Sequence, residues 1–415
     1  MWIDNQIKLI FKINNNNINI KTKLIKKIKR IKRIKRILKM ESFENKGQNG
    51  LPNVGNSCYF NATIQCLAGT DGLIEYFAQT ATLANGKVVR KFEMDLMTVK
   101  KIKNNKTKTK IELVKAYYNL MAQLWTEKGQ IQQVNPIPFY RLIGGVARES
   151  KSSLSISGGQ QDFQEFLILL LGSLHDALSR ETVMNIVGQD LTHMDKLSRQ
   201  AYENFITNYE KDYSIFIKLF IGQINTLTIG ECGHQSNIFD PINFFPLIVP
   251  DSSIKKAVRL EELFHNFVLP SRLSSVVSDN GQENDTRWHC ETCKMKVNAT
   301  TCNTIWDLPQ YLIISLGRYQ YFPKIKKTDT HVIFPLENLD MSNFYKGFKK
   351  NSLKYNLYAV SNHYGGQGGG HYTAFRKNPN NKWYSFNDSH VEEIKEPHKD
   401  VITQGAYCLF YKRID

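Results

Sequence analysis

Residues 50–67 read GLPNVGNSCYFNATIQCL, so small polar residues stand directly before Cys58 and a run compatible with a helix follows it. A thiol at the start of a helix faces unpaired backbone N–H groups and the positive end of the helix dipole, which favour the thiolate. Such a cysteine is suited to act as a nucleophile if a base lies nearby. The alternative is a buried thiol packed beside Tyr59 and Phe60, which is the commoner arrangement.

A second stretch offers the base. Residues 362–375 read NHYGGQGGGHYTAF, where five glycines lead to His371 at the start of an expected strand. Glycines let the backbone bend freely and leave a wall without side chains. A further expected strand, residues 383–388, ends with Asn387 and Asp388. Because the start of one strand meets the end of its antiparallel neighbour, this pair can fix the tautomer of the imidazole. Each motif alone is equally consistent with a turn.

The two halves of the chain differ in hydrophobic period. Residues 163–178 have the i, i+3, i+4, i+7 spacing of a buried helix face. In the second half, short β-branched or aromatic runs separated by Gly, Pro and Asn predict antiparallel strands. These strands are expected at residues 311–316, 357–362, 372–375, 383–386 and 407–411. Helices followed by strands predict an α+β fold. Residues 100–110, which lack an apolar period, are predicted to form an exposed loop.

Bulk composition excludes some classes of protein. No apolar run is longer than the six residues 166–171, whereas a membrane-spanning helix needs about 20. We therefore expect no membrane span, and no apolar stretch near the start fits a signal peptide. The seven cysteines are an odd number, spread thinly along a long chain, and this favours reduced thiols over a disulfide framework. The expected location is the cytoplasm, the nucleus or both.

The net charge of +17 is concentrated near the start of the chain. Residues 1–40 hold thirteen Lys or Arg against Asp4, which leaves only +5 for all the later residues. We predict that residues 1–48 form a basic, Asn-, Ile- and Lys-rich tail that is mostly disordered. A nuclear-import signal, a contact with nucleic acid or acidic lipid, a transit peptide and no role at all stay open for it. Any nucleic-acid contact would rest on residues 1–40.

From about residue 50 to residue 413, the chain resembles the ubiquitin-specific protease family of papain-like cysteine deubiquitinases. Residues 50–67 match the family's cysteine box nearly throughout. SGGQQDFQEFLILLLGSLHDAL, residues 157–178, resembles its glutamine-glutamine-aspartate box. YNLYAVSNHYGGQGGGHYTAFRK, WYSFNDSHV and AYCLFYKR resemble the parts of its histidine box. Three boxes in the family's order are far more specific than any one of them.

The resemblance assigns catalytic roles. It implies that Cys58 is the nucleophile and His371 the general base. It makes Asn387, with Asp388 beside it, the pair that orients the imidazole. Asn53 corresponds to the residue that helps to stabilise the oxyanion. The implied enzyme is a thiol hydrolase that needs no cofactor for turnover.

The resemblance also names the substrate, a ubiquitin conjugate cleaved at the isopeptide or peptide bond of ubiquitin's C-terminal glycine. Gln160 and Asp162 would hold the extended ubiquitin tail. A narrow slot suits a tail that ends in two glycines, and Gly370 in the glycine loop would form one rim. Tyr372 either packs on the tail or belongs to the core. Two alternatives are a catalytically silent ubiquitin-binding scaffold and a protease for another ubiquitin-like modifier.

The implied architecture is a papain-like thumb and palm with a finger extension, within a catalytic domain at residues 49–415. The thumb would be helical, at about residues 50–205. The palm, an antiparallel sheet, and the β fingers would occupy about residues 206–415. Ubiquitin and ubiquitinated proteins are the expected partners, and we expect a monomer.

A metal site is where the sequence departs from the family's pattern. Relatives often carry two CxxC pairs on the fingers, which together hold one zinc ion. Here the Cys290 and Cys293 pair is intact, but Ile229 stands where the first pair has its other cysteine. A structural zinc is therefore disfavoured, and packing in place of the metal is the alternative. The candidate ligands are Cys232, Cys290 and Cys293, with His234 or His289 as the fourth.

Overall fold

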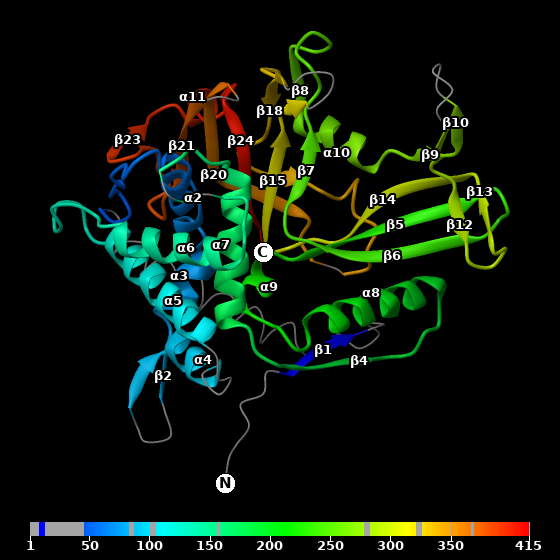
Figure 1. Ribbon diagram of the computed structural model, residues 1–415, viewed down its shortest axis with the longest axis horizontal. Helices are drawn as coiled ribbons and strands as arrows, with labels where there is room; N and C mark the ends of the chain where they lie inside the picture. The colour runs from blue at the N-terminus through cyan, green and yellow to red at the C-terminus, as the bar shows by residue number, and fades with distance from the viewer. Residues whose placement is uncertain are drawn as a thin grey trace, which may run out of the picture.

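The computed structural model describes residues 8–12, 45–82, 87–99, 105–154, 156, 158–277, 283–320, 326–349, 351–366 and 369–414. Within these residues, most helices come from the first half of the chain and most strands from the second (Figure 1). The α+β prediction is confirmed. None of the described helices is both long and apolar enough to span a bilayer.

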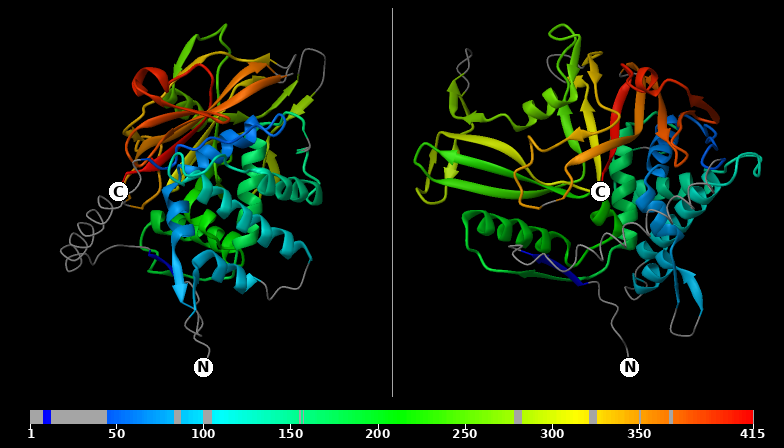
Figure 2. Two further views of the ribbon diagram at one scale, coloured as in Figure 1. Left: turned by 90° about the vertical axis from the view of Figure 1, so that its left-hand side faces the viewer. Right: turned by 180° about the vertical axis from the view of Figure 1, so that it is seen from behind.

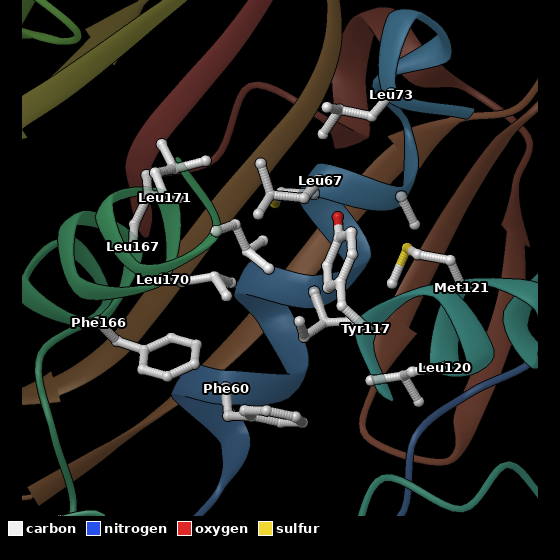
Figure 3. Close-up of a cluster of buried hydrophobic side chains, with 14 of the residues drawn as sticks. Phe60, Leu67, Leu73, Tyr117, Leu120, Met121, Phe166, Leu167, Leu170 and Leu171 are labelled. Atoms are coloured by element: carbon white, nitrogen blue, oxygen red, sulfur yellow. The ribbon is translucent and has the colours of Figure 1, made fainter. Parts of the chain in front are cut away.

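Helix α2 packs against α3 and α7 and is buried along its whole length. Phe60 and Leu67 of α2 lie between Tyr117 of α5 and Phe166 and Leu170 of α7 (Figure 3). Each fully buried side chain of this kind stabilises the fold by about 1.5–3 kcal/mol, so α2 is held firmly. The helices are α2 Cys58–Ala68, α3 Asp71–Ala78, α4 Lys91–Val99, α5 Asn105–Leu124, α6 Ile137–Glu149, α7 Phe163–Leu178, α8 His193–Tyr209, α9 Ile215–Phe220, α10 Leu260–Val268 and α11 Pro397–Asp400.

Helix α7 confirms the periodicity prediction. All seven apolar residues at the expected spacing are buried: Phe163, Phe166, Leu167, Leu170, Leu171, Leu174 and Leu178. The helix begins where Asp162 caps it, because the Asp162 carboxylate accepts hydrogen bonds from the backbone N–H groups of Gln164 and Glu165.

The loop prediction for residues 100–110 is wrong in its second half. Residues 105–110 form the first turns of α5, and residues 100–104 lie outside the described part of the chain. The polar start of α5 has no apolar period of its own. Ile111, Leu113 and Tyr117 further along the helix are buried, and their packing stabilises a helix that propagates back to Asn105.

An eight-stranded sheet covers the helices, and the left-hand view of Figure 2 shows the strands above and the helices below. Its order is β23-β22-β21-β20-β24-β15-β7, with β19 on β20, and only β7 runs parallel to its neighbour. All five predicted strands lie in it. The strands are β7 Phe245–Ile248, β15 Tyr311–Gly317, β19 Leu339–Asp340, β20 Lys354–Gly366, β21 Gly369–Lys377, β22 Trp383–Asn387, β23 His390–Ile394 and β24 Ala406–Arg413.

The sheet is buried on both faces. Ile313 of β15 joins the core shared with α2 and α7, whereas its neighbours Leu312 and Ile314 join a second core with α10. This alternation follows from the two-residue period of a strand. The sheet is therefore fixed against α2, and α2 packs against β20, β21 and β22.

A four-stranded sheet, β6-β5-β14-β9, extends away from α2 and its neighbouring helices, and α8 packs against its β6 (Figures 1 and 2). Its strands are β5 Gly222–Gly230, β6 Gln235–Ile242, β9 Ser271–Leu273 and β14 Ala299–Asp307. A small hairpin, β12 Trp288–Cys290 and β13 Met295–Val297, lies at its far end (Figure 1). The other short strands are β2 Thr80–Thr82, β3 Val88–Arg90, β8 Ala257–Arg259, β10 Ser275–Val277, β11 Glu283–Asp285, β16 Tyr319–Gln320, β17 Lys326–Lys327 and β18 His331–Ile333.

Two parts of the predicted tail lie within the described residues. Residues 8–12 form β1 Lys8–Lys12, which pairs in parallel with β4 Val183–Val187. Residues 45–48 lie against the end of α5, where the backbone N–H of Lys128 donates to the carbonyl oxygen of Asn45. Residues 1–7 and 13–44 of the predicted tail lie outside the described residues.

Candidate active site

Cys58 is the first residue of α2 and lies at a cleft of about 420 Å³. One wall of the cleft comes from the start of α2 and from residues 160–168 at the start of α7. The other wall comes from β20, β21 and β24 and includes Gly370 and Tyr372. The cleft thus runs between the helices and the eight-stranded sheet. Its lining residues include Cys58, Gln160, Asp162, Gly370 and Tyr372, but not Asn53, His371, Asn387 or Asp388.

The Cys58 thiol is buried, and this burial raises its pKa. The negative charge of Asp388 raises the pKa further, while a hydrogen bond from the Tyr372 backbone lowers it. The pKa of Cys58 is raised overall. The thiolate that the helix start alone would favour is therefore disfavoured. Desolvation outweighs the favourable backbone N–H groups at this helix end.

His371 and Asn387 come together across neighbouring strands. β21 pairs antiparallel with β22, and Nε2 of His371 lies 2.6 Å from Oδ1 of Asn387. An amide oxygen only accepts, so Nε2 donates and Nδ1 is left with a lone pair. That is the tautomer required of a general base. Tyr372, the next residue after His371, contacts Cys58 through its backbone, so β21 brings His371 to the nucleophile's end of the cleft.

Asp388 faces a different neighbour from Asn387. Its Oδ2 accepts from Nδ2 of Asn53 at 2.9 Å, and its Oδ1 accepts from Nδ2 of Asn61 at 2.7 Å. Its carbonyl oxygen accepts from the backbone N–H of Leu51. Asp388 therefore ties the end of β22 to the loop before α2, whereas Asn387 contacts the imidazole. No sequence pattern points to Asn61; its place one helical turn after Cys58 is the only signal.

Asn53 is held rigidly beside the start of α2. Its Oδ1 accepts from the backbone N–H groups of Gly55 and Ser57, both at 3.1 Å. The tight turn is built with left-handed backbone at Gly55 and Asn56, where φ is 106° and 48°. The Asn53 side chain is exposed, and its N–H₂ group, which donates to Asp388, lies five residues before Cys58 along the chain.

Gln160 bridges the cleft. Its Nε2 donates to the carbonyl oxygen of Gly370, and its Oε1 accepts from the N–H of Gly370, both at 3.0 Å. Two residues proposed from sequence to bind the substrate therefore bind each other. The paired bonds hold the glycine rim of the sheet against the helical wall.

Asp162 joins the two walls at the floor of the cleft. One carboxylate oxygen caps α7, and the other accepts from the hydroxyl groups of Tyr372 and Tyr407, at 3.3 and 2.6 Å. Burial raises the pKa of both tyrosines, so both stay protonated and donate. Tyr372 lines the cleft and also belongs to the buried core, and its contact with the ubiquitin tail stays a prediction.

A possible metal centre lies at the far end of the four-stranded sheet. Its four side chains offer ligand atoms that all lie within 4.8 Å of one another. Nδ1 of His234 lies 3.7 Å from the Cys290 sulfur and 3.3 Å from the Cys293 sulfur. The His289 ring instead approaches Glu291. The cluster is Cys232, His234, Cys290 and Cys293.

The cluster has the chemistry of a zinc site. Three thiolates and one imidazole around tetrahedral zinc lie roughly 3.5–3.8 Å apart, close to the observed spacing. The backbone N–H of Cys293 donates to the Cys290 sulfur, which lowers the pKa of Cys290 to about 7. Burial raises the pKa of Cys293 to about 11. All seven cysteines lie in the described residues as free thiols, as predicted.

Known proteins resemble this chain along most of its length. Human ubiquitin carboxyl-terminal hydrolase 2 is 30% identical over 379 residues, covering 90% of the chain and 56% of that protein. The Gallus gallus protein of the same name is 33% identical over 373 residues, covering 88% and 94%. Ubiquitin carboxyl-terminal hydrolase 4 of Saccharomyces cerevisiae strain YJM789 is 30% identical over 397 residues, covering 88% and 39%. The chain spans about half the length of the human relative.

The fold agrees with a solved structure. The SAGA Ubp8/Sgf11/Sus1/Sgf73 DUB module bound to ubiquitin aldehyde matches with a TM-score of 0.61 at 20% identity, covering 90% of this chain and 71% of that one. This likeness concerns the fold alone. A family model described as ubiquitin carboxyl-terminal hydrolase matches residues 49–411. The resemblance seen in the sequence is confirmed: the chain belongs to the ubiquitin carboxyl-terminal hydrolase family, in its ubiquitin-specific protease branch.

Proposed function

We propose that this chain is a thiol-dependent deubiquitinase, which hydrolyses the isopeptide or peptide bond at the C-terminal glycine of ubiquitin. One observation carries the proposal: Cys58 contacts the backbone of Tyr372 from the opposite wall of one cleft, and the preceding residue, His371, is bound to Asn387. The rim beside them is glycine backbone. Such a slot admits a tail ending in two glycines and excludes larger side chains.

In the proposed mechanism, His371 takes the proton of Cys58 through Nδ1 while Asn387 holds Nε2. The sulfur attacks the glycine carbonyl, and the Asn53 amide with nearby backbone N–H groups stabilises the oxyanion. Protonated His371 gives its proton to the departing lysine amine. Water then attacks the thioester, with His371 again as the base, and frees the ubiquitin carboxylate. Because the pKa of Cys58 is raised, the thiol keeps its proton until the base removes it.

The test is labelling by ubiquitin that carries a C-terminal electrophile. The wild-type chain is expected to form a covalent adduct, and Cys58→Ala none. Cys66→Ala is a matched control, because Cys66 lies on the same helix and is fully buried away from the cleft. Adduct formation that persists in Cys58→Ala would contradict the proposal.

The same assay separates the alternatives. A silent ubiquitin-binding scaffold would bind ubiquitin without forming an adduct. A protease for another modifier would react with probes built on that modifier and ignore the ubiquitin probe.

We also propose that Cys232, His234, Cys290 and Cys293 hold one structural zinc ion. The donor set and its spacing support this assignment. Bound zinc would join the β5–β6 turn to the β12–β13 hairpin and so stiffen the extended sheet. The catalytic steps above do not involve it.

For its location, we propose the cytoplasm or the nucleus. The seven free cysteines support this assignment, because thiols stay reduced in these compartments. Imaging of a fluorescent fusion tests this assignment, and retention in a secretory compartment would contradict it.

A further inference from the structure

Lys327 reaches from β17 to the strand that leads to the glycine loop. Its Nζ donates to the carbonyl oxygens of His363 and Gly365, both at 2.9 Å, and to Nδ1 of the His363 ring at 3.0 Å. An ammonium group has three protons, so these three acceptors use them all. Lys327 is thus fully engaged by the end of β20.

The end of β20 has backbone carbonyl groups that lack a partner strand, and this explains the position of Lys327. β20 pairs with β24 only as far as Asn362, because β24 begins at Ala406. The N–H of His363 still donates to the carbonyl oxygen of Gly405 on that side. The carbonyl groups of His363 and Gly365 point to the same side but have passed the end of β24. The ammonium group of Lys327 replaces the missing strand as their donor.

The hydrogen bonds from Lys327 to His363 and Gly365, here called the Lys327 clamp, lie close to the proposed catalytic groups. The His363 ring packs on the Tyr372 ring with centroids 4.4 Å apart, and Tyr372 touches Cys58 through its backbone. On the paired strands, His363 stands opposite Tyr372 and Tyr364 stands opposite His371. A shift of β20 would therefore move both the base and the residue that contacts the nucleophile.

The electrostatics keep the His363 ring neutral. Burial, and then the charge of Lys327, lower the pKa of His363 to about 4, and His371 adds a small effect in the same direction. Asp162 opposes them. Because Nδ1 accepts from Lys327, the ring proton sits on Nε2 and the orientation of the ring is fixed.

We propose that Lys327 is a positioning residue for the hydrolysis reaction, acting through His363 and the end of β20 to hold His371 and Tyr372 against Cys58. This inference rests on the proposed deubiquitinase function. Lys327 itself does not touch the reacting atoms. Its side chain is saturated by internal acceptors, so its effect belongs to the alignment of the active site and not to substrate binding.

The matched pair of variants is Lys327→Met and Lys326→Met. The two lysines are neighbours on β17, but Lys326 pairs with Asp251, away from the cleft. With ubiquitin bearing a C-terminal fluorescent amide as the substrate, we expect Lys327→Met to lower kcat by about 10- to 100-fold. We expect KM to change less than about threefold, because the Lys327 ammonium group is already occupied by acceptors within the chain. Lys326→Met should match wild type in both constants.

A second variant shows whether the effect passes through His363. His363→Gln removes the ring but leaves the two carbonyl contacts of Lys327. We therefore expect a smaller loss of kcat than in Lys327→Met. If Lys327→Met does not fold, the kcat of His363→Gln tests the inference. In the double variant, the loss should be smaller than the product of the two single losses.

Three results would overturn the inference. Equal kcat values for Lys327→Met and Lys326→Met would remove the role of Lys327 while leaving the proposed function intact. A loss confined to KM would assign Lys327 to substrate binding. No turnover by wild type would overturn the proposed function and this inference together.

Discussion

Asp388 acts on Cys58, the proposed nucleophile, in two opposed ways. Its carboxylate holds Asn53 and Asn61, which fixes the loop and the helix that present Cys58. The same negative charge raises the pKa of Cys58 and so disfavours the thiolate. Asp388 therefore fixes the position of Cys58 but makes its thiol harder to ionise. The proposed base, His371, then has to remove a proton from a thiol whose pKa is raised.

The pH dependence of Cys58 alkylation tests this view. A raised pKa moves deprotonation to higher pH, so the rate of reaction with iodoacetamide should be slow at pH 7 and still rising above pH 9. Mass spectrometry of the peptide that contains Cys58 measures the rate. A fast rate that is constant between pH 6 and 8 would instead indicate a preformed thiolate.

Removal of the Asp388 carboxylate separates its two effects. In Asp388→Ala the charge that raises the Cys58 pKa is gone, so alkylation at pH 7 should be faster than in wild type. Asn53 loses its anchor, so turnover should fall by roughly 100-fold, as when an oxyanion donor is lost. Asn387→Ala is the control, since it should lower turnover without speeding alkylation. Slower alkylation or unchanged turnover in Asp388→Ala would contradict this account.

At the scale of secondary structure elements, the sequence predicted the features that depend on residues close together in the chain. Helix α7 and the five strands follow from hydrophobic period, and the contact of His371 with Asn387 follows from strand ends. The contact of Lys327 with His363 depends on β24 beginning only at Ala406, opposite Asn362. No local sequence pattern shows this pairing.

The choice between His234 and His289 was open in the sequence but has a simple structural reason. His289 and Cys290 are neighbours on β12, and side chains alternate between the faces of a strand. With Cys290 in the cluster, His289 has to point away from it. His234 lies in the turn between β5 and β6, next to Cys232, and reaches the cluster from the facing hairpin.

The proposed zinc site predicts a pair of histidine variants with opposite outcomes. Purified wild-type protein should contain about one zinc ion per chain by elemental analysis. His234→Ala should lose the metal and lower the Tm by roughly 5 °C or more, whereas His289→Ala should keep both. Labelling of Cys58 by the ubiquitin probe should survive in both variants. Metal-free wild type, or equal metal content in the two variants, would contradict the site.

For the whole molecule, the candidate active site lies where the helical half meets the β half. Asp162 of the first half accepts hydrogen bonds from Tyr372 and Tyr407 of the second, and Gln160 holds Gly370. The three boxes in the sequence predicted which segments meet. The sequence assigned these side chains to substrate binding, which stays a prediction. Their contacts across the cleft depend on how distant segments pack, and no local pattern shows them. The division into thumb, palm and fingers at residues 50–205 and 206–415 stays a prediction.

The basic tail gives the last prediction, which concerns the charge of the whole chain. Residues 1–40 carry most of the net charge, yet the cleft and its catalytic groups lie between residues 53 and 407. A chain that starts at residue 45 should therefore be labelled by the ubiquitin probe as fast as wild type. Its affinity for a duplex RNA should become weak and nearly independent of salt, whereas wild-type affinity should fall steeply between 50 and 200 mM salt.

Replacing the Lys and Arg residues of positions 21–39 by Gln keeps β1 and removes the charge, so it is the matched control for this truncation. If charge alone binds RNA, this variant should behave like the truncated chain. If it binds RNA like wild type, the contact does not depend on the basic run. Slower probe labelling of the truncated chain than of the Gln variant would show instead that the pairing of β1 with β4 supports the catalytic domain.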